Sequence, residues 1–251
     1  MARNIALLLL VLFGLPAMAA EPLSVVTLGD SLTQGDGDDG MGGGYPARLQ
    51  QLLAASHPGS TVKNLGQSGW TSDDLINTQL EPAVAALRAT PSGHTPVALV
   101  WIGSNDLFGL YNWVCDNDYH NNFAACEGDG AQNFRNNLQR ILSALKGSGA
   151  QVYIALLDDQ SKRPVMSNPE LRTSNFDSIS ADDVPRMSAQ TAKYNEIIRQ
   201  LAQQQGATTV DFLNTTLFEE PATLAEDGNH PNGTGYDMIA ERWYRSIVQS
   251  R

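Results

Sequence analysis

The chain is poor in basic residues and in cysteine, and beyond its N-terminus it has no apolar run long enough to span a membrane. Its 16 Lys and Arg residues are outnumbered by 27 Asp and Glu residues, which gives a net charge of −11. An acidic chain is repelled by nucleic acid and by anionic membrane surfaces, so we expect neither as a partner. With two cysteines and no C-x₂-C spacing, the sequence does not indicate a structural metal site.

The longest apolar run lies at the N-terminus. Arg3 is followed by apolar residues 5–15, then by a proline and the small-residue tripeptide Ala-Met-Ala, which ends at Ala19. This order is typical of a secretory signal peptide, whereas a transmembrane anchor needs about 20 apolar residues. We therefore expect residues 1–19 to be a signal peptide, residues 20–251 to form the mature domain, and the protein to be secreted or periplasmic without stable insertion into a membrane.

The mature chain has the length of one larger domain. Short apolar, β-branched runs followed by turn residues are typical of buried parallel strands, and they occur at residues 24–28, 61–65, 97–102, 152–156 and 208–212. Apolar residues recur at three- and four-residue spacing, which predicts helices, at residues 45–55, 73–89, 133–145, 188–205 and 234–248. This alternation predicts a doubly wound α/β sandwich around a mainly parallel five-stranded sheet.

Two stretches, residues 107–130 and 158–184, fit neither pattern and are predicted to be long loops. The first holds both Cys115 and Cys126. In an oxidising compartment a short-loop disulfide is the expected state, with two free thiols as the alternative. His120 and several acids lie nearby, but without the spacing of a metal site.

Two other patterns resemble ligand-binding motifs. Residues 35–40 satisfy G-x-G-x-x-G, but three aspartates within them would repel a pyrophosphate, so we expect a flexible rim to an active-site mouth and not a dinucleotide site. Asp116, Asp118 and Glu127 match the first, third and twelfth positions of an EF-hand loop. Asn121 stands where that loop requires glycine, so calcium is not expected there, and it remains a minor alternative at residues 35–40.

The first predicted strand runs directly into the sequence Gly-Asp-Ser-Leu at residues 29–32. Ligands of open α/β sheets bind at the carboxyl ends of the strands, which is where this places Ser31. Taken alone, a serine in a strand-to-helix turn is more often a helix N-cap than a nucleophile.

Near the other end of the chain stands Asp-Gly-Asn-His-Pro at residues 227–231, just before a predicted helix. Three-residue spacing in a tight turn lets the carboxylate of Asp227 hold the imidazole of His230 in one tautomer and stabilise the imidazolium. A loop histidine without function is the alternative. His57, His94 and His120 have no acid three residues before them.

A nucleophile and a base also need donors for the oxyanion that forms during acyl transfer. After the second strand, residues 64–69 read Asn-Leu-Gly-Gln-Ser-Gly, and glycine allows a tight backbone that points an N–H into a cleft. After the third strand, residues 103–106 read Gly-Ser-Asn-Asp, where Asn105 can donate from its amide. Individually, each of these residues is more often a turn residue.

Together these four motifs, in this order, resemble the SGNH hydrolase superfamily, the GDSL esterases and lipases. The resemblance spans nearly the whole mature chain. It implies a flavodoxin-like three-layer α/β/α sandwich and a Ser31, His230 and Asp227 triad that needs no metal and no cofactor. It also implies an oxyanion hole formed by the Ser31 N–H, the Gly69 N–H and the Asn105 side chain, with Gly66 as the alternative to Gly69. Asp30 is expected to hold the turn.

The resemblance implies a serine carboxylic-ester hydrolase that acts through an acyl-enzyme. Its substrates would be small esters, acetylated sugars, lysophospholipids or thioesters. Aromatic residues beside the Asn105 motif would stack on sugar rings, grip an acyl chain or simply pack; they are Phe108, Tyr111, Trp113, Tyr119 and Phe123. We expect removal of short acyl groups from a small-molecule or glycan ester, with lysophospholipid hydrolysis as the alternative and a non-catalytic glycan-binding module as a third.

Overall fold

The computed structural model describes residues 20–172 and 176–249, and the expected signal peptide lies outside them. A single parallel sheet forms the centre of the domain, with the strand order β2-β1-β3-β4-β5. The strands are β1 (Leu23–Gly29), β2 (Thr61–Asn64), β3 (Thr95–Trp101), β4 (Gln151–Leu156) and β5 (Thr208–Asp211). Each agrees with its predicted range to within two residues, so the predicted parallel five-stranded sheet is confirmed.

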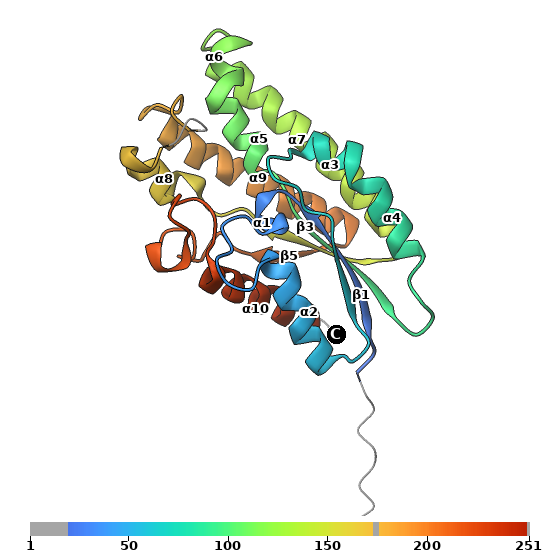
Figure 1. Cartoon of the computed structure of the whole chain (residues 1–251). Helices are drawn as coiled ribbons and strands as arrows, with labels where there is room; N and C mark the ends of the chain where they lie inside the picture. Colours follow the sequence, from blue (N-terminus) through green and yellow to red (C-terminus); the bar gives the residue numbers. More distant parts are fainter. Residues whose placement is uncertain (1–19, 173–175, 250–251) are drawn as a thin grey trace, which may run out of the picture.

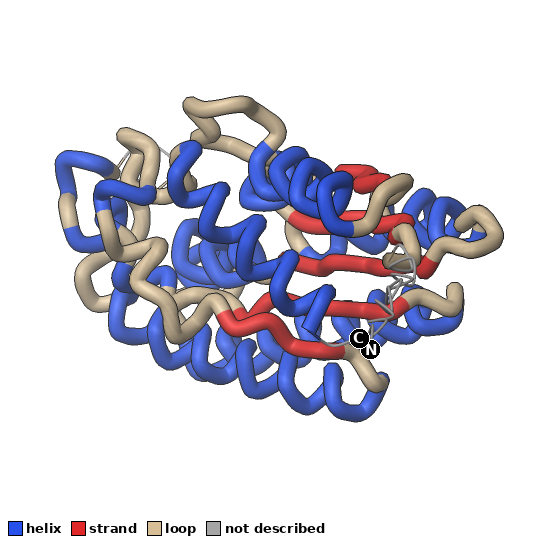
Figure 2. The backbone as a smooth tube through the Cα atoms, turned by 90° about the horizontal axis from the view of Figure 1, so that it is seen from below, coloured by secondary structure: helices blue, strands red, loops and turns tan. Residues whose placement is uncertain are grey.

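Helices cover both faces of this sheet, as Figures 1 and 2 show. One face carries α2 (Gly44–Ser56) and α10 (Gly233–Gln249), which pack against each other. The other face carries α3 (Ser72–Thr78), α4 (Leu80–Arg88), α7 (Phe123–Gly147) and α9 (Asp183–Gln205). Within the described residues, no helix is long and apolar enough to cross a membrane.

The helix predicted over residues 73–89 is wrong in one respect, because the structure divides it into α3 and α4 at Gln79. Pro82 has no N–H to donate to the carbonyl of Thr78, so one continuous helix would lose a hydrogen bond there. The buried side chain of Gln79 instead bonds the backbone of Gly29, accepting from its N–H at 2.9 Å and donating to its carbonyl at 2.8 Å. The break therefore ties these helices to the end of β1.

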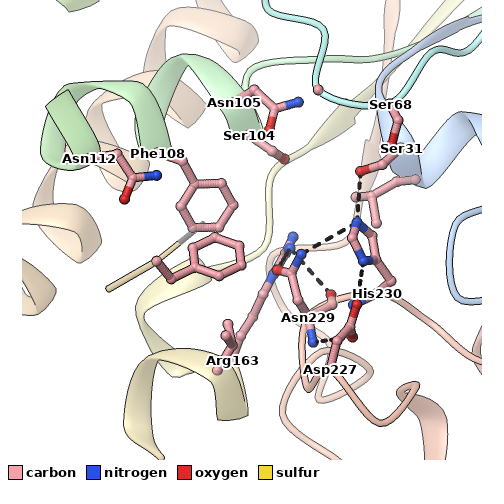
Figure 3. A pocket seen from close by; sticks show the side chains of 14 residues that line it. Ser31, Ser68, Ser104, Asn105, Phe108, Asn112, Arg163, Asp227, Asn229 and His230 are labelled. Carbon is pink, nitrogen blue, oxygen red and sulfur yellow. Dashed lines mark hydrogen bonds and ion pairs between the residues drawn. The ribbon is translucent and has the colours of Figure 1, made fainter. Parts of the chain in front are cut away.

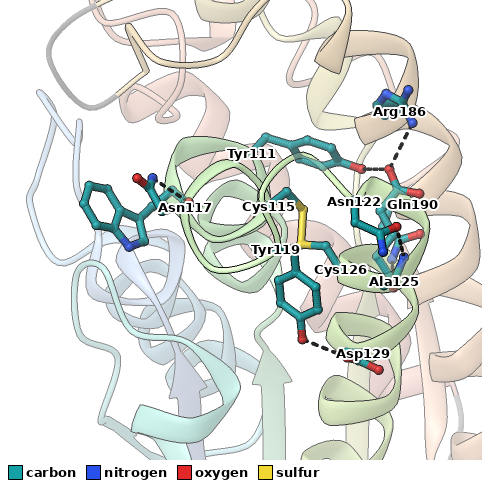
Figure 4. Close-up of a disulfide and its surroundings, with 12 residues drawn as sticks. Tyr111, Cys115, Asn117, Tyr119, Asn122, Ala125, Cys126, Asp129, Arg186 and Gln190 are labelled. Atoms are coloured by element: carbon teal, nitrogen blue, oxygen red, sulfur yellow. Dashed lines mark hydrogen bonds and ion pairs between the residues drawn. A yellow bond between two sulfur atoms is a disulfide. The ribbon is translucent and has the colours of Figure 1, made fainter.

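The loop predicted over residues 107–130 is also wrong, because most of it is helical. It contains the end of α5 (Ser104–Gly109), a π-helical turn (Leu110–Val114), α6 (Cys115–Asn117) and the start of α7. Gly128 and Gly130 lower the helix propensity and hide this helix in the sequence. Gly130 packs closely, since a Cβ there would lie 2.7 Å from the end of the Leu110 side chain, which would have to shift to accept it. The predicted disulfide is confirmed: Cys115 and Cys126 are bonded and join α6 to α7 (Figure 4).

The second predicted loop, residues 158–184, holds short helical turns in its described part. They are a 3₁₀ turn (Gln160–Lys162), α8 (Pro164–Ser167) and a second 3₁₀ turn (Pro169–Leu171). Helix α9 starts at Asp183, earlier than the predicted residue 188.

The buried apolar residues form two clusters. The larger one surrounds the sheet and includes the side chains of its flanking helices. The smaller one lies to one side and comprises Phe108, Leu110, Tyr111, Cys115, Cys126, Val165, Met166, Ile179 and Met187. We call the segments that carry this smaller cluster, residues 107–130, 158–172 and 176–187, the side lobe.

Candidate active site

Ser31 lies where β1 turns into the short helix α1 (Ser31–Gln34), at the carboxyl edge of the sheet. Gly29 has a φ of +157°, and a Cβ there would lie 2.2 Å from the carbonyl oxygen of Trp101 on β3, so only glycine fits. Asp30 is the N-cap of α1 and accepts a hydrogen bond from the Leu32 N–H at 3.0 Å. This turn presents Ser31 at the end of the central strands.

A chain of hydrogen bonds links Ser31, His230 and Asp227 (Figure 3). His230 Nε2 lies 3.0 Å from Ser31 Oγ, and His230 Nδ1 lies 2.6 Å from Asp227 Oδ2. An ionised Asp227 can only accept, so it favours the tautomer with the proton on Nδ1. Nε2 is then left as the acceptor for the Ser31 hydroxyl.

The charge state of Asp227 follows from its surroundings. Partial burial alone would raise its pKa, but hydrogen bonds from the His230 ring and from the backbone N–H groups of His230 and Asn229 lower the pKa to about 2. Both backbone N–H groups donate to Asp227 Oδ1 at 2.9 Å. Asp227 is therefore a carboxylate at neutral pH, and the turn between it and His230 is held by its own backbone.

The three proposed oxyanion donors lie on one cavity together with His230. Ser31 is the first residue of α1, where backbone N–H groups have no partner within the helix. Neither the Ser31 N–H nor the Gly69 N–H donates a hydrogen bond to a described residue. Asn105 Nδ2 donates one hydrogen to the Trp70 carbonyl at 2.9 Å and keeps a second for the cavity.

Gly66, the alternative to Gly69, does not line this cavity. Its N–H already donates to Asn64 Oδ1 at 2.8 Å, and a Cβ on Gly66 would lie 2.5 Å from the Gln34 nitrogen. Gly69 has a φ of +81° and open space around its Cα. The geometry thus favours Gly69 as the donor.

Asp106 anchors the Asn105 motif to α3. It accepts hydrogen bonds from the N–H and the hydroxyl of Ser72, and Ser72 in turn accepts from Asn137 on α7 at 3.0 Å. Burial raises the pKa of Asp106 to about 6, although the bonds from Ser72 oppose the shift.

Asp30, next to Ser31, is fully buried, and one of its carboxylate oxygens has no hydrogen-bond partner among the described residues. Burial raises the pKa of Asp30 to about 7, against the opposing effects of the Leu32 N–H and the charge of Arg163. Asp30 thus caps α1 and does not contact His230 through a hydrogen bond, as expected for a residue that holds the turn.

The cavity beside Ser31 has a volume of about 500 Å³. Sequence reasoning missed most of its walls; they include Ser104, Asn112, Arg163, Val165, Phe176 and Asn229. Figure 3 labels Ser104, Asn112, Arg163 and Asn229 around the cavity. Most come from segments predicted as loops, where no periodic pattern points to a pocket. Arg163 lies in such a segment, with Asp158 five residues before it as the one local signal of an ion pair.

Of the five aromatic residues expected beside the site, only Phe108 lines the cavity. Tyr111 is buried and donates to Glu127 at 3.0 Å, and Tyr119 donates to Asp129 at 2.8 Å (Figure 4). Phe123 stacks on Tyr111, while Trp113 is 63% exposed. Three of the five therefore hold the side lobe together.

The acidic residues of the two weak motifs have other partners. Asp38 forms a buried ion pair with Arg48 at 2.6 Å, and Asp39 accepts from the Gly233 N–H at 2.7 Å. Residues 35–40 are thus tied to α2 and α10, and the flexibility expected of this segment stays a prediction. No group of three or more His, Cys, Asp or Glu side chains in the described parts of the chain is placed to hold a metal ion.

The chain is similar to known proteins in sequence and in structure. A family model described as the GDSL-like lipase/acylhydrolase family matches residues 27–238. The chain is 23% identical to a multidomain esterase of Ruminococcus flavefaciens over 91% of its own length but only 29% of that protein. It is 25% identical to the uncharacterized protein YpmR of Bacillus subtilis (strain 168), over 90% of this chain and 82% of that protein.

Solved structures share the fold. The α/β hydrolase LAE5 from the metagenome of Lake Arreo aligns with a TM-score of 0.63 and 22% identity, covering 92% of this chain and 98% of that one. Axe2, an acetylxylan esterase from Geobacillus stearothermophilus, aligns with a TM-score of 0.61 and 20% identity, covering 92% of this chain and 96% of that one. At these identities the likeness establishes the three-layer fold and not the substrate.

Proposed function

Because the chain belongs to the GDSL-like lipase/acylhydrolase family and is an ester hydrolase of that type, we propose that Ser31 is its nucleophile and that His230 and Asp227 activate it. The observation that carries the proposal is the continuous hydrogen-bonded chain from Asp227 through His230 to Ser31, on the same cavity as Gly69 and Asn105.

The reaction follows from the geometry. His230 Nε2 takes the proton of Ser31 Oγ as this oxygen bonds the ester carbonyl carbon, and Asp227 stabilises the resulting imidazolium. The Ser31 N–H, the Gly69 N–H and Asn105 Nδ2 stabilise the oxyanion. The bond to the alcohol oxygen then breaks, that oxygen takes the proton from Nε2, and water releases the acyl group from Ser31 by the same steps.

The proposed substrate is a short acyl ester, such as an acetyl group on a carbohydrate. The cavity combines the apolar side chains Phe108, Val165 and Phe176 with polar groups of serine, asparagine and arginine. Burying a long acyl chain against unsatisfied polar groups costs free energy, which favours a short acyl group. The similarity to a multidomain esterase and to an acetylxylan esterase supports this substrate class.

Secretion is part of the proposal. The apolar run at residues 5–15 has the form of a signal peptide, and the bonded pair Cys115 and Cys126 fits an oxidising compartment.

Two measurements test this function. A fluorophosphonate should add one phosphonyl group to Ser31, detected by intact mass and peptide mapping, and the Ser31→Ala variant should stay unlabelled. In a series of p-nitrophenyl esters, kcat/KM should fall at least tenfold from acetate to octanoate, and acetylated xylan should release acetate. Labelling at another serine would refute the nucleophile, and a preference for octanoate or for a lysophospholipid would refute the short-acyl substrate.

A further inference from the structure

Arg163 forms a buried ion pair beneath the cavity that the reaction described above does not use. Its Nε and Nη2 donate to the two carboxylate oxygens of Asp158 at 2.8 and 2.7 Å. Both side chains are almost completely buried. A bidentate pair of this kind fixes the guanidinium plane, and it leaves Nη1 free to donate elsewhere.

The remaining nitrogen of Arg163 fixes the side chain of Asn229. Arg163 Nη1 donates to Asn229 Oδ1 at 2.8 Å, and a guanidinium has donors only. The Asn229 amide therefore must turn its oxygen toward Arg163 and its nitrogen the other way. The Asn229 backbone is held as well, because its N–H donates to Asp227 Oδ1.

The amide nitrogen of Asn229 consequently faces the reacting atoms. Asn229 Nδ2 lies 3.4 Å from His230 Nε2, as Figure 3 shows, and Asn229 lines the cavity although its exposed fraction is only 5%. Two nitrogens at this separation can both reach one oxygen atom at hydrogen-bond distance. In acyl transfer the oxygen that must come to Nε2 is the leaving oxygen of the alcohol.

We propose that Asn229 is a catalytic residue that donates a hydrogen bond to the leaving alcohol oxygen, and that Arg163 is the positioning residue that aims it. This inference rests on the proposed function. As the bond between the carbonyl carbon and the alcohol oxygen breaks, negative charge grows on that oxygen until it takes the proton from Nε2. A second donor at the same oxygen stabilises this charge in the transition state.

The proposal predicts a dependence on the leaving group. A p-nitrophenolate carries its own charge well, whereas an alkoxide from an aliphatic or sugar alcohol needs stabilisation. Asn229→Ala should therefore lower kcat/KM by a few fold for p-nitrophenyl acetate and by roughly 10- to 100-fold for an alkyl acetate. The parameter kcat/KM is used because it reports formation of the acyl-enzyme, the step in which the alcohol leaves.

A second variant separates this role from folding. Asn229→Asp keeps an oxygen for Arg163 but replaces the donor nitrogen, so it should show the same or a steeper leaving-group dependence with Arg163 still paired. Asn112→Ala removes another cavity amide, which lies across the cavity from His230 in Figure 3, and should leave the ratio of the two esters unchanged. An equal loss on both esters in the two Asn229 variants would show that Asn229 only supports the structure, and would overturn the proposal.

The role of Arg163 is tested through Asn229. Arg163→Lys keeps the charge beside Asp158 but cannot reach both partners, so it should produce part of the same selective loss on the alkyl acetate. The double variant Arg163→Lys, Asn229→Ala should have the same ratio of kcat/KM values for the two esters as Asn229→Ala alone. The reason is that both residues act on the leaving alcohol oxygen. Additive changes in that ratio would refute the positioning role. Retained activity in Ser31→Ala would instead refute the proposed function itself, so the two failures are distinguishable.

Discussion

The sheet-centred core and the side lobe build opposite sides of the same cavity by different means. The core places the groups that we propose react: Ser31 follows β1, Asn105 follows β3, and His230 precedes α10. The side lobe supplies walls such as Phe108, Val165 and Phe176. The chemistry thus depends on the ends of hydrogen-bonded strands, and the shape of the pocket depends on a small separate cluster. The two should respond differently to substitution.

The forces that hold the two regions differ accordingly. Every strand of the core is paired along the sheet, and the central strands are buried on both faces. The side lobe depends on its small apolar cluster, one disulfide and a few hydrogen bonds between its segments. Among these, Arg172 donates to the carbonyls of Ile179 and Met166 at 2.7 Å, and Ser178 donates to Asn112 at 3.1 Å. Fewer buried contacts imply a lower free energy for local opening.

Removing the nucleophile from the core side should have the largest effect. Ser31→Ala should lower kcat by a factor on the order of 10⁴ or more, because triad members act as a unit. Its hydroxyl contacts His230 and supports no other described residue, so the free energy of unfolding should change by about 0.5 kcal/mol or less. Stopped-flow and steady-state ester hydrolysis measure the first, and urea unfolding the second. Wild-type turnover in this variant would end the triad assignment.

The oxyanion donor on α5 should come next. Asn105→Ala should reduce kcat by roughly 10² to 10³, because its amide is proposed to stabilise charge that exists only in the transition state. Asn105 also donates to the Trp70 carbonyl, so thermal unfolding serves as the control for a local shift. A change confined to KM would mean that Asn105 binds the substrate and does not stabilise the oxyanion.

The two regions also differ in how well their structure could be predicted from the sequence. The strands of the core were predictable, because β-branched runs buried on both faces have a local signature. The candidate site residues could be singled out because each motif is short and continuous: Ser31 and Asn105 follow strands, and His230 precedes a helix. In the structure these side chains line one cavity. The order of the strands along the chain suggests this arrangement but does not establish it.

The side lobe could not be predicted in the same way. Its helices contain Gly128 and Gly130, and the low helix propensity of glycine predicts a loop there, although Gly130 packs closely against Leu110 in the folded protein. Arg163 acts through Asn229, 66 residues away in the sequence, and no local pattern records such a contact. Pro82 is a local signal for the break at Gln79, but the apolar spacing continues across it and predicts one helix.

Asp30 lies next to Ser31 in the core, and its substitution tests whether burying this carboxyl lowers the stability of the folded protein. The pKa of this carboxyl is about 7 in the folded protein because of burial, against 3.8 in the unfolded chain. Between these values the folded state binds more protons, so its stability should fall as the pH rises from about 4 to 7. Asp30→Asn should remove this dependence on pH. The difference in free energy of unfolding between wild type and variant should therefore change by a few kcal/mol between pH 4 and pH 7.

Urea unfolding of both proteins at several pH values measures this difference. Asp106, whose pKa is also raised, is present in both proteins, and its charge is the smallest of the effects on the pKa of Asp30, so its own dependence largely cancels. A constant difference from pH 4 to pH 7 would mean that Asp30 titrates near its ordinary value.

Breaking the disulfide should give the smallest and most selective effect, confined to the side lobe. Cys115 and Cys126 lie 11 residues apart, and closing so short a loop is worth at most about 3 kcal/mol on the chain-entropy model. The double Cys→Ser variant should therefore unfold at a lower temperature. Both cysteines are buried in the cluster that carries Phe108 and Val165, so the cavity wall should loosen while the sheet ends stay in place.

The comparison predicts which activity survives in that variant. Hydrolysis of p-nitrophenyl acetate should stay within a few fold of wild type, because Ser31, His230 and Asn105 all belong to the core side. Discrimination between acetate and octanoate should decrease, since the wall that excludes a longer chain is less rigid. If acetate hydrolysis fell as far as it does in Asn105→Ala while the protein remained folded, the side lobe would have to position Ser31, His230 or Asn105 as well as Asn229, and the division between the two regions would fail.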